Sequence, residues 1–320
     1  MSDPQFVGPI DRLLYMRTLP QVAGLETREL AIIARQATEV YVRKGEIVLR
    51  EGDPVDRMYV VVSGQIALTT HGVEIMRCLP GDNVGIIPAL AKSEPRFEAR
   101  ATQDTVALSL DIDIMLAAME ENFHLFQNSL RSLARFHLDM MPDIIGGTRR
   151  APWVGEGVKV PDRPLDVVER LVLLRRGNIF RNLGLEALVL MATSMEQQRW
   201  KAGTELWTPG EPADYLLVIL DGECVGTLDD GTTFEAGRGY PLGNLETLAR
   251  GERWYTAKAT TDLITLRGNH EALFDVLEDD VDVAMHFIES VAAGAMNALE
   301  RLAELGGPEA APRMARVESA

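Results

Sequence analysis

The chain has 320 residues, of which 46% are hydrophobic and 25% are charged, and this globular composition is long enough for two domains with their own cores. Its formal net charge of −16 argues against a protein that binds a nucleic-acid backbone, since such proteins usually carry a basic face. The two cysteines, Cys78 and Cys224, are too few for a disulfide framework or a zinc site.

The N-terminal stretch shows no basic segment followed by an apolar core, so no secretory signal is expected. No apolar run approaches the roughly 20 residues that a membrane-spanning helix needs. A soluble, cytoplasmic protein without a membrane span is therefore the expectation.

The chain is an internal repeat with an offset of 158 residues. The stretch 51–68 lies over 209–226, and 84–104 lies over 242–262 without a gap. The repeat predicts two copies of one module, joined by a segment rich in proline and glycine. The expected parts are domain 1 at 10–141, a linker at 142–164, domain 2 at 165–305 and a disordered tail at 306–320.

Within each copy the expected elements follow the same order. Apolar residues at helical spacing predict an opening helix over 26–37 and another over 183–195. Short alternating stretches punctuated by glycine then predict the strands of a small β-barrel or jelly roll. Each copy closes with a long predicted helix, over 115–141 and over 271–305.

The second closing helix has an apolar seam near coiled-coil spacing. An isolated helix would expose this seam, so either the two closing helices pair within one chain or two chains form a homodimer through 284–302. The seam residues are Ala284, Ile288, Val291, Ala295, Leu299 and Leu302.

The order of elements, and above all the stretch 42–68 "VRKGEIVLREGDPVDRMYVVVSGQIAL", resembles the cyclic-nucleotide-binding domain family. That family includes the regulatory subunit of cyclic-AMP-dependent protein kinase and the catabolite activator protein. The resemblance covers nearly the whole chain, twice. It implies a mainly β fold with α: two cyclic-nucleotide-binding-like β-rolls, each with N-terminal helices and a long C-terminal helix. It also implies a pocket for a cyclic nucleotide, cAMP or cGMP.

The family holds the cyclic phosphate on a short helical segment and on an arginine about nine residues further on. The resemblance places "LGNLETL", 242–248, at the segment and Arg253 at the arginine, whose planar donors match phosphate oxygens. Asn244 replaces the family's ribose-binding glutamate, and Trp254 replaces a small residue, so it can stack on a base or fill the pocket. The candidate ligand-binding residues are Gly243, Asn244, Leu245, Arg253, Trp254 and Thr256.

Copy one departs from the family pattern at the same positions. Pro95 and Glu98 stand where copy two has Arg253 and Thr256. A carboxylate about 5 Å from a phosphate costs on the order of 3 kcal/mol at an effective dielectric near 20. Arg96 is one residue out of register, which in a strand turns a side chain to the opposite face. We therefore expect domain 1 to serve as structure or as a docking surface.

Other functions lack support in the sequence. Residues 271–305 hold nine acids and one base, which argues against DNA binding. The histidines show no metal-ligand spacing and no catalytic motif is present, so neither an enzyme, a metal site nor a cofactor is expected. We expect a non-enzymatic intracellular signalling protein, a candidate cAMP or cGMP receptor through domain 2 that regulates a partner protein. The alternative is a ligand-free scaffold built from two degenerate domains.

Overall fold

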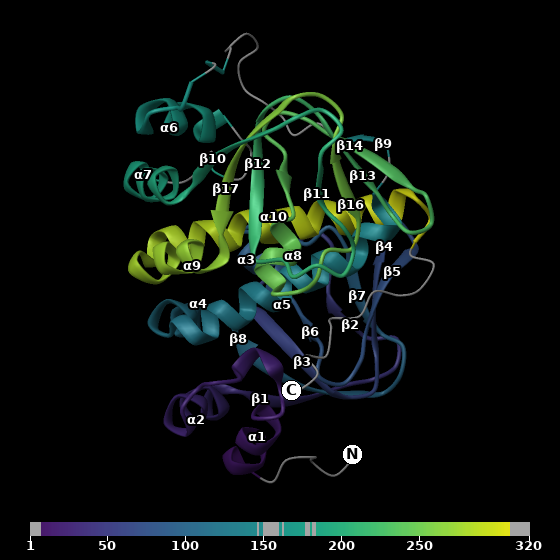
Figure 1. The fold of residues 1–320 in the computed structure, drawn as a ribbon. Helices are drawn as coiled ribbons and strands as arrows, with labels where there is room; N and C mark the ends of the chain where they lie inside the picture. The colour runs from purple at the N-terminus through teal and green to yellow at the C-terminus, as the bar shows by residue number, and fades with distance from the viewer. Residues whose placement is uncertain are drawn as a thin grey trace. The chain divides into compact units, whose positions relative to one another are not determined.

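The structure is a computed structural model that describes residues 8–145, 147–149, 160–161, 163–176, 180 and 184–307 (Figure 1). Most of the expected linker and tail lies outside the described residues. The chain divides into two compact units. Unit 1 combines the chain up to Ile144 with the chain from Ile288 onward, and unit 2 is Ile145–Phe287. The expected domain boundaries stay predictions.

Unit 1 opens with three short helical elements: α1 (Pro9–Met16), the 3-10 turn η1 (Pro20–Val22) and α2 (Thr27–Gln36). Its two antiparallel sheets have the orders β1-β8-β3-β6 and β2-β7-β4-β5. The strands are β1 (Thr38–Val42), β2 (Ile47–Leu49), β3 (Arg57–Ser63), β4 (Ile66–Thr70), β5 (Val73–Cys78), β6 (Asn83–Val84), β7 (Glu98–Ala101) and β8 (Thr105–Asp111). The remaining helices are α3 (Ile86–Leu90), which follows β6, and α4 (Ile112–Glu121) and α5 (Phe123–Ile144), which follow β8.

Unit 2 repeats this order with β10-β17-β12-β15 in one sheet and β11-β16-β13-β14-β9 in the other, where β9 adds in parallel to β14. Its strands are β9 (Gly147–Arg149), β10 (Glu196–Trp200), β11 (Glu205–Trp207), β12 (Tyr215–Asp221), β13 (Cys224–Thr227), β14 (Thr233–Ala236), β15 (Pro241–Leu242), β16 (Thr256–Ala259) and β17 (Leu263–Asn269). Its helices are α6 (Val167–Arg176), α7 (Leu185–Ser194), α8 (Asn244–Ala249) and α9 (His270–Asp279), and α10 (Val281–Glu304) begins here. The predicted pair of β-rolls with flanking helices is confirmed.

One pair of glycines shows why the repeat keeps its spacing. Gly64 and Gly222, 158 residues apart, both have left-handed backbones, with φ of +88° and +90°. A Cβ atom would lie 2.4 Å from the carbonyl oxygen of Asp104 at the first position and 2.3 Å from that of Asp262 at the second. Each turn therefore approaches the neighbouring main chain so closely that only glycine fits.

Each predicted closing helix is in fact two helices. The first breaks at Asn122, whose Oδ1 accepts the Leu125 amide at 3.0 Å, and the second breaks at Asp280, whose Oδ1 accepts the Val283 amide at 3.1 Å. Asn and Asp are favoured helix N-caps because their side chains satisfy amides that lack intrahelical partners. Capping thus overrides the continuous apolar periodicity at these two positions.

The apolar seam of α10 is covered within the chain. All six seam residues are buried, from 0% exposed at Ile288 to 9% at Val291. In unit 1, α10 meets α5 closely, because a Cβ on Gly294 would lie 3.0 Å from Cε1 of His137. The homodimer through 284–302 stays a prediction, which this burial does not support.

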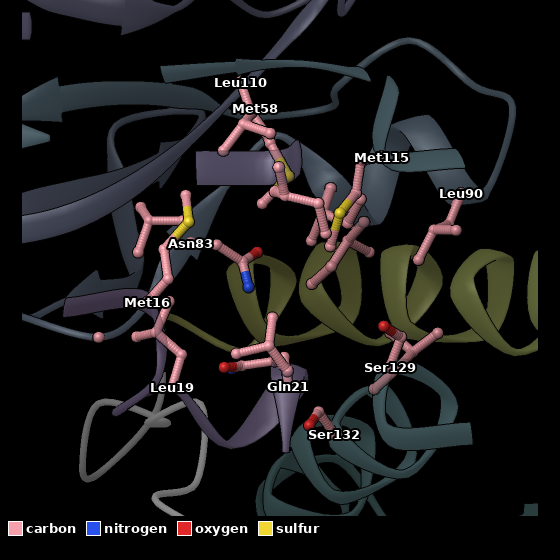
Figure 2. A pocket seen from close by; sticks show the side chains of 17 residues that line it. Met16, Leu19, Gln21, Met58, Asn83, Leu90, Leu110, Met115, Ser129 and Ser132 are labelled. Atoms are coloured by element: carbon pink, nitrogen blue, oxygen red, sulfur yellow. The ribbon is translucent and has the colours of Figure 1, made fainter. Parts of the chain in front are cut away.

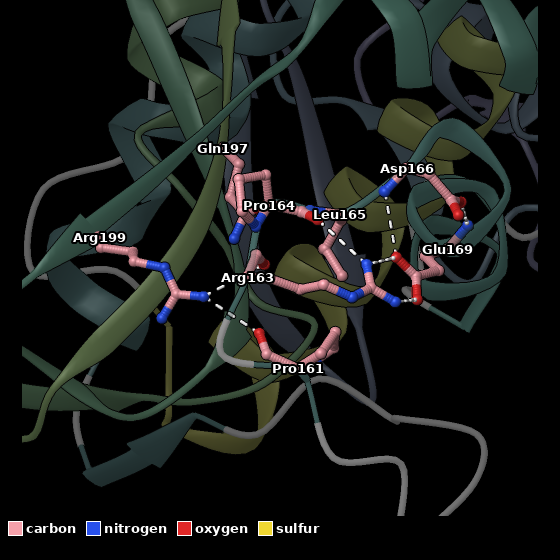
Figure 3. A network of polar contacts seen from close by, with 8 residues as sticks. All are labelled: Pro161, Arg163, Pro164, Leu165, Asp166, Glu169, Gln197 and Arg199. Carbon is pink, nitrogen blue, oxygen red and sulfur yellow. Dashed lines mark hydrogen bonds and ion pairs between the residues drawn. The ribbon is translucent and has the colours of Figure 1, made fainter.

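A reciprocal cap fixes the start of α6 (Figure 3). The Asp166 amide donates to Glu169 Oε2 at 3.0 Å, and the Glu169 amide donates to Asp166 Oδ1 at 2.9 Å. Arg163 binds both oxygens of Glu169, at 2.7 and 2.8 Å. The segment is tied to β10 as well, since the Leu165 amide donates to Gln197 Oε1 at 2.7 Å. These contacts fix Arg163, near the end of the expected linker, to the start of α6, and fix Leu165 to β10.

Two further observations concern the cysteines and the possibility of a membrane-spanning helix. Cys78 and Cys224 are buried free thiols, at 0% and 1% exposed, and burial raises the pKa of both. Among the described residues, no helix is both long enough and apolar enough to cross a membrane.

Candidate functional site

The structure brings Gly243 and Arg253 into direct contact in the β-roll of unit 2, here called roll 2, the β-roll of unit 1 being roll 1. Gly243 precedes α8 and has a left-handed backbone with φ of +70°, and a Cβ there would lie 2.1 Å from Nη1 of Arg253. Any other residue at 243 would displace the guanidinium. Arg253 lies just before β16 and is only 2% exposed, so it is not a surface charge in solvent.

Aromatic rings and main-chain carbonyls surround the Arg253 guanidinium. Its Cζ atom lies 4.1 Å from the ring centre of Trp207 and 4.9 Å from that of Tyr215, both within cation–π range. Nη1 donates to the Gly243 carbonyl at 3.2 Å, and Nη2 donates to the Tyr215 carbonyl. The arginine therefore points inward, with part of its donor fork engaged by the protein itself.

Thr247 on α8 shares these two carbonyls. Its buried hydroxyl lies 2.6 Å from the Gly243 oxygen and 2.7 Å from the Tyr215 oxygen. Arg253 and α8 are thus joined through a common pair of acceptors, so a change in either one alters the hydrogen bonding of the other.

Glu246 is the principal residue that the sequence interpretation missed. It lies on α8, is 3% exposed, and burial raises its pKa. A backbone hydrogen bond, the Arg253 charge and a hydrogen bond with the Trp254 indole oppose this rise of the pKa. A second carboxyl, that of the exposed Glu211, has its pKa lowered mainly by Thr208 and also by Arg253. The Arg253 charge thus favours the ionised form of both carboxyl groups, but at Glu246 the effect of burial is larger.

Two polar atoms in this region are buried without a hydrogen-bond partner among the described residues. They are Nε1 of Trp207 and Nε of Arg253, and both are donors. Each such group costs about 1–3 kcal/mol, and buried polar groups in native proteins are usually paired.

An aromatic cluster extends from Arg253 into the roll. Tyr255 is 3% exposed and meets Trp207, Phe234 and Trp254 edge-on, with ring centres 5.7, 5.0 and 5.1 Å away. Gly226 gives Phe234 its room, because a Cβ there would lie 2.1 Å from that ring. Trp254 itself is only half-buried, so Tyr255 rather than Trp254 fills the interior.

The other candidate residues lie around this centre. Leu245 is buried on α8, whereas Asn244 is half-buried. Thr256 lies in β16, where it pairs with Thr227 of β13. Glu246 and Thr247 stand within the stretch 242–248, so their neighbourhood was predictable, but Trp207 and Tyr215 reach Arg253 only through the fold.

The equivalent segment of roll 1 is apolar. Ile86 and Ile87 on α3 are each 7% exposed, and Pro95, at the Arg253 position, is buried. Arg96 instead points outward to α10, where Nη1 donates to Glu300 Oε2 at 2.7 Å. As the register argument predicts, Arg96 does not replace the missing arginine.

Unit 1 has an apolar cavity of about 60 Å³ beside α3 (Figure 2). The side chains of Met16, Met58 and Met115 surround it, and Ser129 and Ser132 border it from α5. Its walls come from α1, η1, α2, β3, β6, α3, β8, α4 and α5. This cavity lacks charged side chains and does not reproduce the arginine site of roll 2.

A contact at the end of α8 connects the site to the next helix. Arg250, which ends α8 with a left-handed φ of 50°, donates from Nε to Nε2 of His270 at 3.1 Å. His270 is 7% exposed, begins α9 and stacks on Phe274 at 4.3 Å. A displacement of α8 would therefore act directly on α9.

The chain matches one protein family in each of its two β-rolls. The family model "Cyclic nucleotide-binding domain" matches residues 39–122 and 197–280, together more than half of the chain. A CRP-like cAMP-activated global transcriptional regulator of Mycobacterium tuberculosis is 26% identical over 117 residues, which are 35% of this chain and 52% of that protein. An uncharacterised NTE family protein of Mycobacterium bovis is 30% identical over 106 residues, 33% of this chain and 18% of that protein. The chain thus spans about half or less of these relatives.

Among solved structures, the regulatory subunit of a cAMP-independent protein kinase A from Trypanosoma brucei is similar over 87% of this chain and 89% of its own. The sequence identity is 16% and the TM-score is 0.35.

Proposed function

Because the chain belongs to the cyclic nucleotide-binding domain family, we propose that it is a non-enzymatic signalling protein that senses a small nucleotide-type ligand through Arg253 and regulates a partner protein. The observation that carries this proposal is the inward guanidinium of Arg253, buried on Trp207 and in contact with Gly243. The family resemblance suggests cAMP and cGMP as ligands.

Ligand binding would act through competition for Arg253. A ligand that accepts hydrogen bonds from the guanidinium would weaken its bonds to the Gly243 and Tyr215 carbonyls, which also hold Thr247 of α8. The resulting shift of α8 would reach α9 through Arg250 and His270. Such a switch requires that the ligand bind one position of α8 more tightly than the other.

The exposed face of α9 is the surface where a partner would detect this shift. Glu271, Asp275 and Glu278 are exposed there, so a partner with a basic surface fits best. The partner itself would bind in the cytoplasm, in keeping with the expectation from the sequence.

Isothermal titration calorimetry tests the receptor function directly. The titrants are cAMP, cGMP, adenosine and guanosine, and the proteins are the wild type, Arg253→Ala and Arg253→Lys, with Arg96→Ala as the matched arginine control of roll 1. Binding to the wild type and Arg96→Ala, lost in Arg253→Ala and weakened in Arg253→Lys, supports the proposal. No binding of any titrant to folded wild type contradicts it.

The alternative is a ligand-free scaffold, and one observation favours it. The Arg253 fork is partly occupied by main-chain carbonyls, as expected for an arginine that stabilises the roll. In that case Arg253→Ala would lower the melting temperature, while no titrant would raise that of the wild type.

A further inference from the structure

The cavity of unit 1 has an apolar side and a polar side (Figure 2). In that view the side chains of Met58 and Met115 lie above the amide of Asn83, and those of Gln21 and Ser132 lie below it. The described lining comprises 17 residues, and none of them is charged. Because an ionised group would leave water here without an opposite charge to pair with, a ligand of this cavity is uncharged.

Asn83 of β6 brings an unpaired amide oxygen to this cavity. Its Oδ1 atom is buried and has no hydrogen-bond partner among the described residues. Unsatisfied buried acceptors are rare in native proteins, and a hydroxyl group satisfies such an acceptor by donating one hydrogen bond. The torsion that turns an asparagine amide is broad, so Oδ1 can turn toward a ligand in the cavity.

The repeat shows that the flexible part of this lining is particular to roll 1. Three of the lining residues are methionines, and the three matching residues of roll 2 are leucines that are at most 3% exposed. The pairs are Met16 and Leu174, Met58 and Leu216, and Met115 and Leu273. One lining position reverses the exchange, since Ile33 matches Met191. Methionine adapts its shape more readily than leucine, so the exchange favours a cavity that can adjust to an occupant.

Side-chain size and polarity change at the same time. Val22 and Ser129 line the cavity, whereas the matching residues of roll 2 are Phe180 and Phe287, which are 2% and 3% exposed. The smaller side chains leave room in roll 1 that the two phenylalanines would take. The residue that matches Asn83 is a proline, which has no polar side chain. Space and an unpaired acceptor therefore occur together in roll 1.

We propose that the cavity of unit 1 is a second ligand site, independent of Arg253, for a small uncharged aliphatic alcohol. A volume of about 60 Å³ has room for about four or five non-hydrogen atoms, since one water molecule needs about 10–15 Å³. The alkyl chain packs on the methionines, and the hydroxyl donates to Oδ1 of Asn83. Both α3 and α5 line the cavity, so the ligand contacts the roll and its flanking helices together.

Methyl resonances of the full chain, labelled with ¹³C in its methionines, test the site. Ethanol, 1-butanol and 1-hexanol are titrated, and Met→Leu variants assign the signals. We expect 1-butanol to shift Met16, Met58 and Met115 with a Kd of about 1 mM, and to leave the buried Met195 of roll 2 unchanged. Each added methylene should tighten binding about fourfold until the cavity is full, so 1-hexanol should gain little over 1-butanol.

A change at Asn83 tests the hydrogen bond. Asn83→Leu keeps the side-chain size but removes the acceptor, and 1-chlorobutane is a ligand of similar size that has no hydroxyl. The ratio of the Kd of 1-butanol to that of 1-chlorobutane should rise about 10-fold in Asn83→Leu. Asn297→Leu, at an exposed asparagine of the same unit, is the control and should leave this ratio unchanged.

Changes at Ser129 test the location. Ser129→Phe introduces the residue of roll 2 and should abolish alcohol binding, and the smaller Ser129→Val should weaken it. Ser132→Ala keeps the cavity open and should bind as the wild type does. Melting curves establish that each variant is folded.

Each contrary result overturns a stated part of the proposal. If 1-butanol moves no methionine methyl group of unit 1, there is no ligand site. If it binds but Asn83→Leu leaves the ratio unchanged, the ligand is an apolar molecule and not an alcohol. If both Ser129 variants bind as the wild type does, the location is wrong. If 1-hexanol gains the full factor for each methylene, the size limit is wrong. The receptor function of Arg253 stands or falls separately, by its own titration.

Discussion

Rolls 1 and 2 have the same strand order, but they differ in the segment that follows β6 in roll 1 and β15 in roll 2. This segment has buried ionisable side chains in roll 2 and lacks them in roll 1. In roll 2, Glu246 and Arg253 are two buried ionisable side chains beside an aromatic cluster. In roll 1, proline occupies both matching positions, and Arg96 serves a surface ion pair instead. The β-roll therefore depends on its glycine turns and apolar strands. The buried side chains of this segment can differ between the two rolls without loss of the fold.

The largest expected effect concerns the glycine turns, which both rolls share. Gly64→Ala and Gly222→Ala should each destabilise their own roll by about 4 kcal/mol, because both require a left-handed backbone and place Cβ against a main-chain oxygen. Hydrogen exchange read by mass spectrometry would localise the loss. Gly72→Ala is the control, with a φ of +80° but open space around its Cβ. Equal losses in Gly64→Ala and Gly72→Ala would refute the steric argument.

The next effect concerns His137 on α5, which the repeat does not duplicate, since the matching position 295 is alanine. Burial lowers the pKa of His137 to about 4. The unfolded chain therefore takes up a proton at this residue near pH 6.5, and the folded chain does not. The contribution of His137 to stability should be constant above about pH 6.5 and should fall by about 3 kcal/mol between pH 6.5 and pH 4.

Urea unfolding across this pH range checks the His137 prediction. His137→Leu should remove that share of the slope, whereas His71→Asn, at an exposed histidine of the same unit, should keep it. An identical slope in the wild type and His137→Leu would show that other groups cause the pH dependence.

A smaller effect concerns Trp207 of roll 2, which has no aromatic counterpart in roll 1. Trp207→Leu introduces the residue that roll 1 has at position 49, and it removes the ring beneath Arg253. We expect a loss of about 2 kcal/mol in the unfolding free energy from lost packing and cation–π contact. Ligand affinity should fall as well. Full ligand binding in a destabilised Trp207→Leu would mean that the ring supports the fold and not the site.

The smallest expected effect is at Arg96. Its ion pair with Glu300 is half-exposed, so Arg96→Ala should cost less than about 1 kcal/mol, and the cost should shrink at high salt. Denaturation at two salt concentrations measures it, with Glu300→Ala and the double variant completing a cycle. A coupling energy well above 1 kcal/mol would show that this pair fastens α10 more firmly than a surface contact.

Much of this arrangement follows from the repeat. The glycine spacing predicts both rolls, and the register of Pro95 and Arg96 predicts that roll 1 lacks the site. The helix breaks at Asn122 and Asp280 were readable as caps, but the apolar periodicity continues across them and favours one long helix. Trp207 approaches Arg253 only after β11 and the segment before β16 come together, so no local pattern in the sequence indicates that contact. Glu246 lies within the predicted segment 242–248, but its burial depends on the packing of α8 and was not predictable from the sequence.

Each roll contains one buried thiol, and the modification of that thiol can report when the roll opens. Cys78 lies in unit 1 and Cys224 in unit 2, and each is buried and held in its unreactive, protonated form. An alkylating reagent can modify either one only when the surrounding roll opens. Mass spectrometry of the two labelled peptides would therefore give separate opening rates for the two rolls in the unmodified wild-type chain.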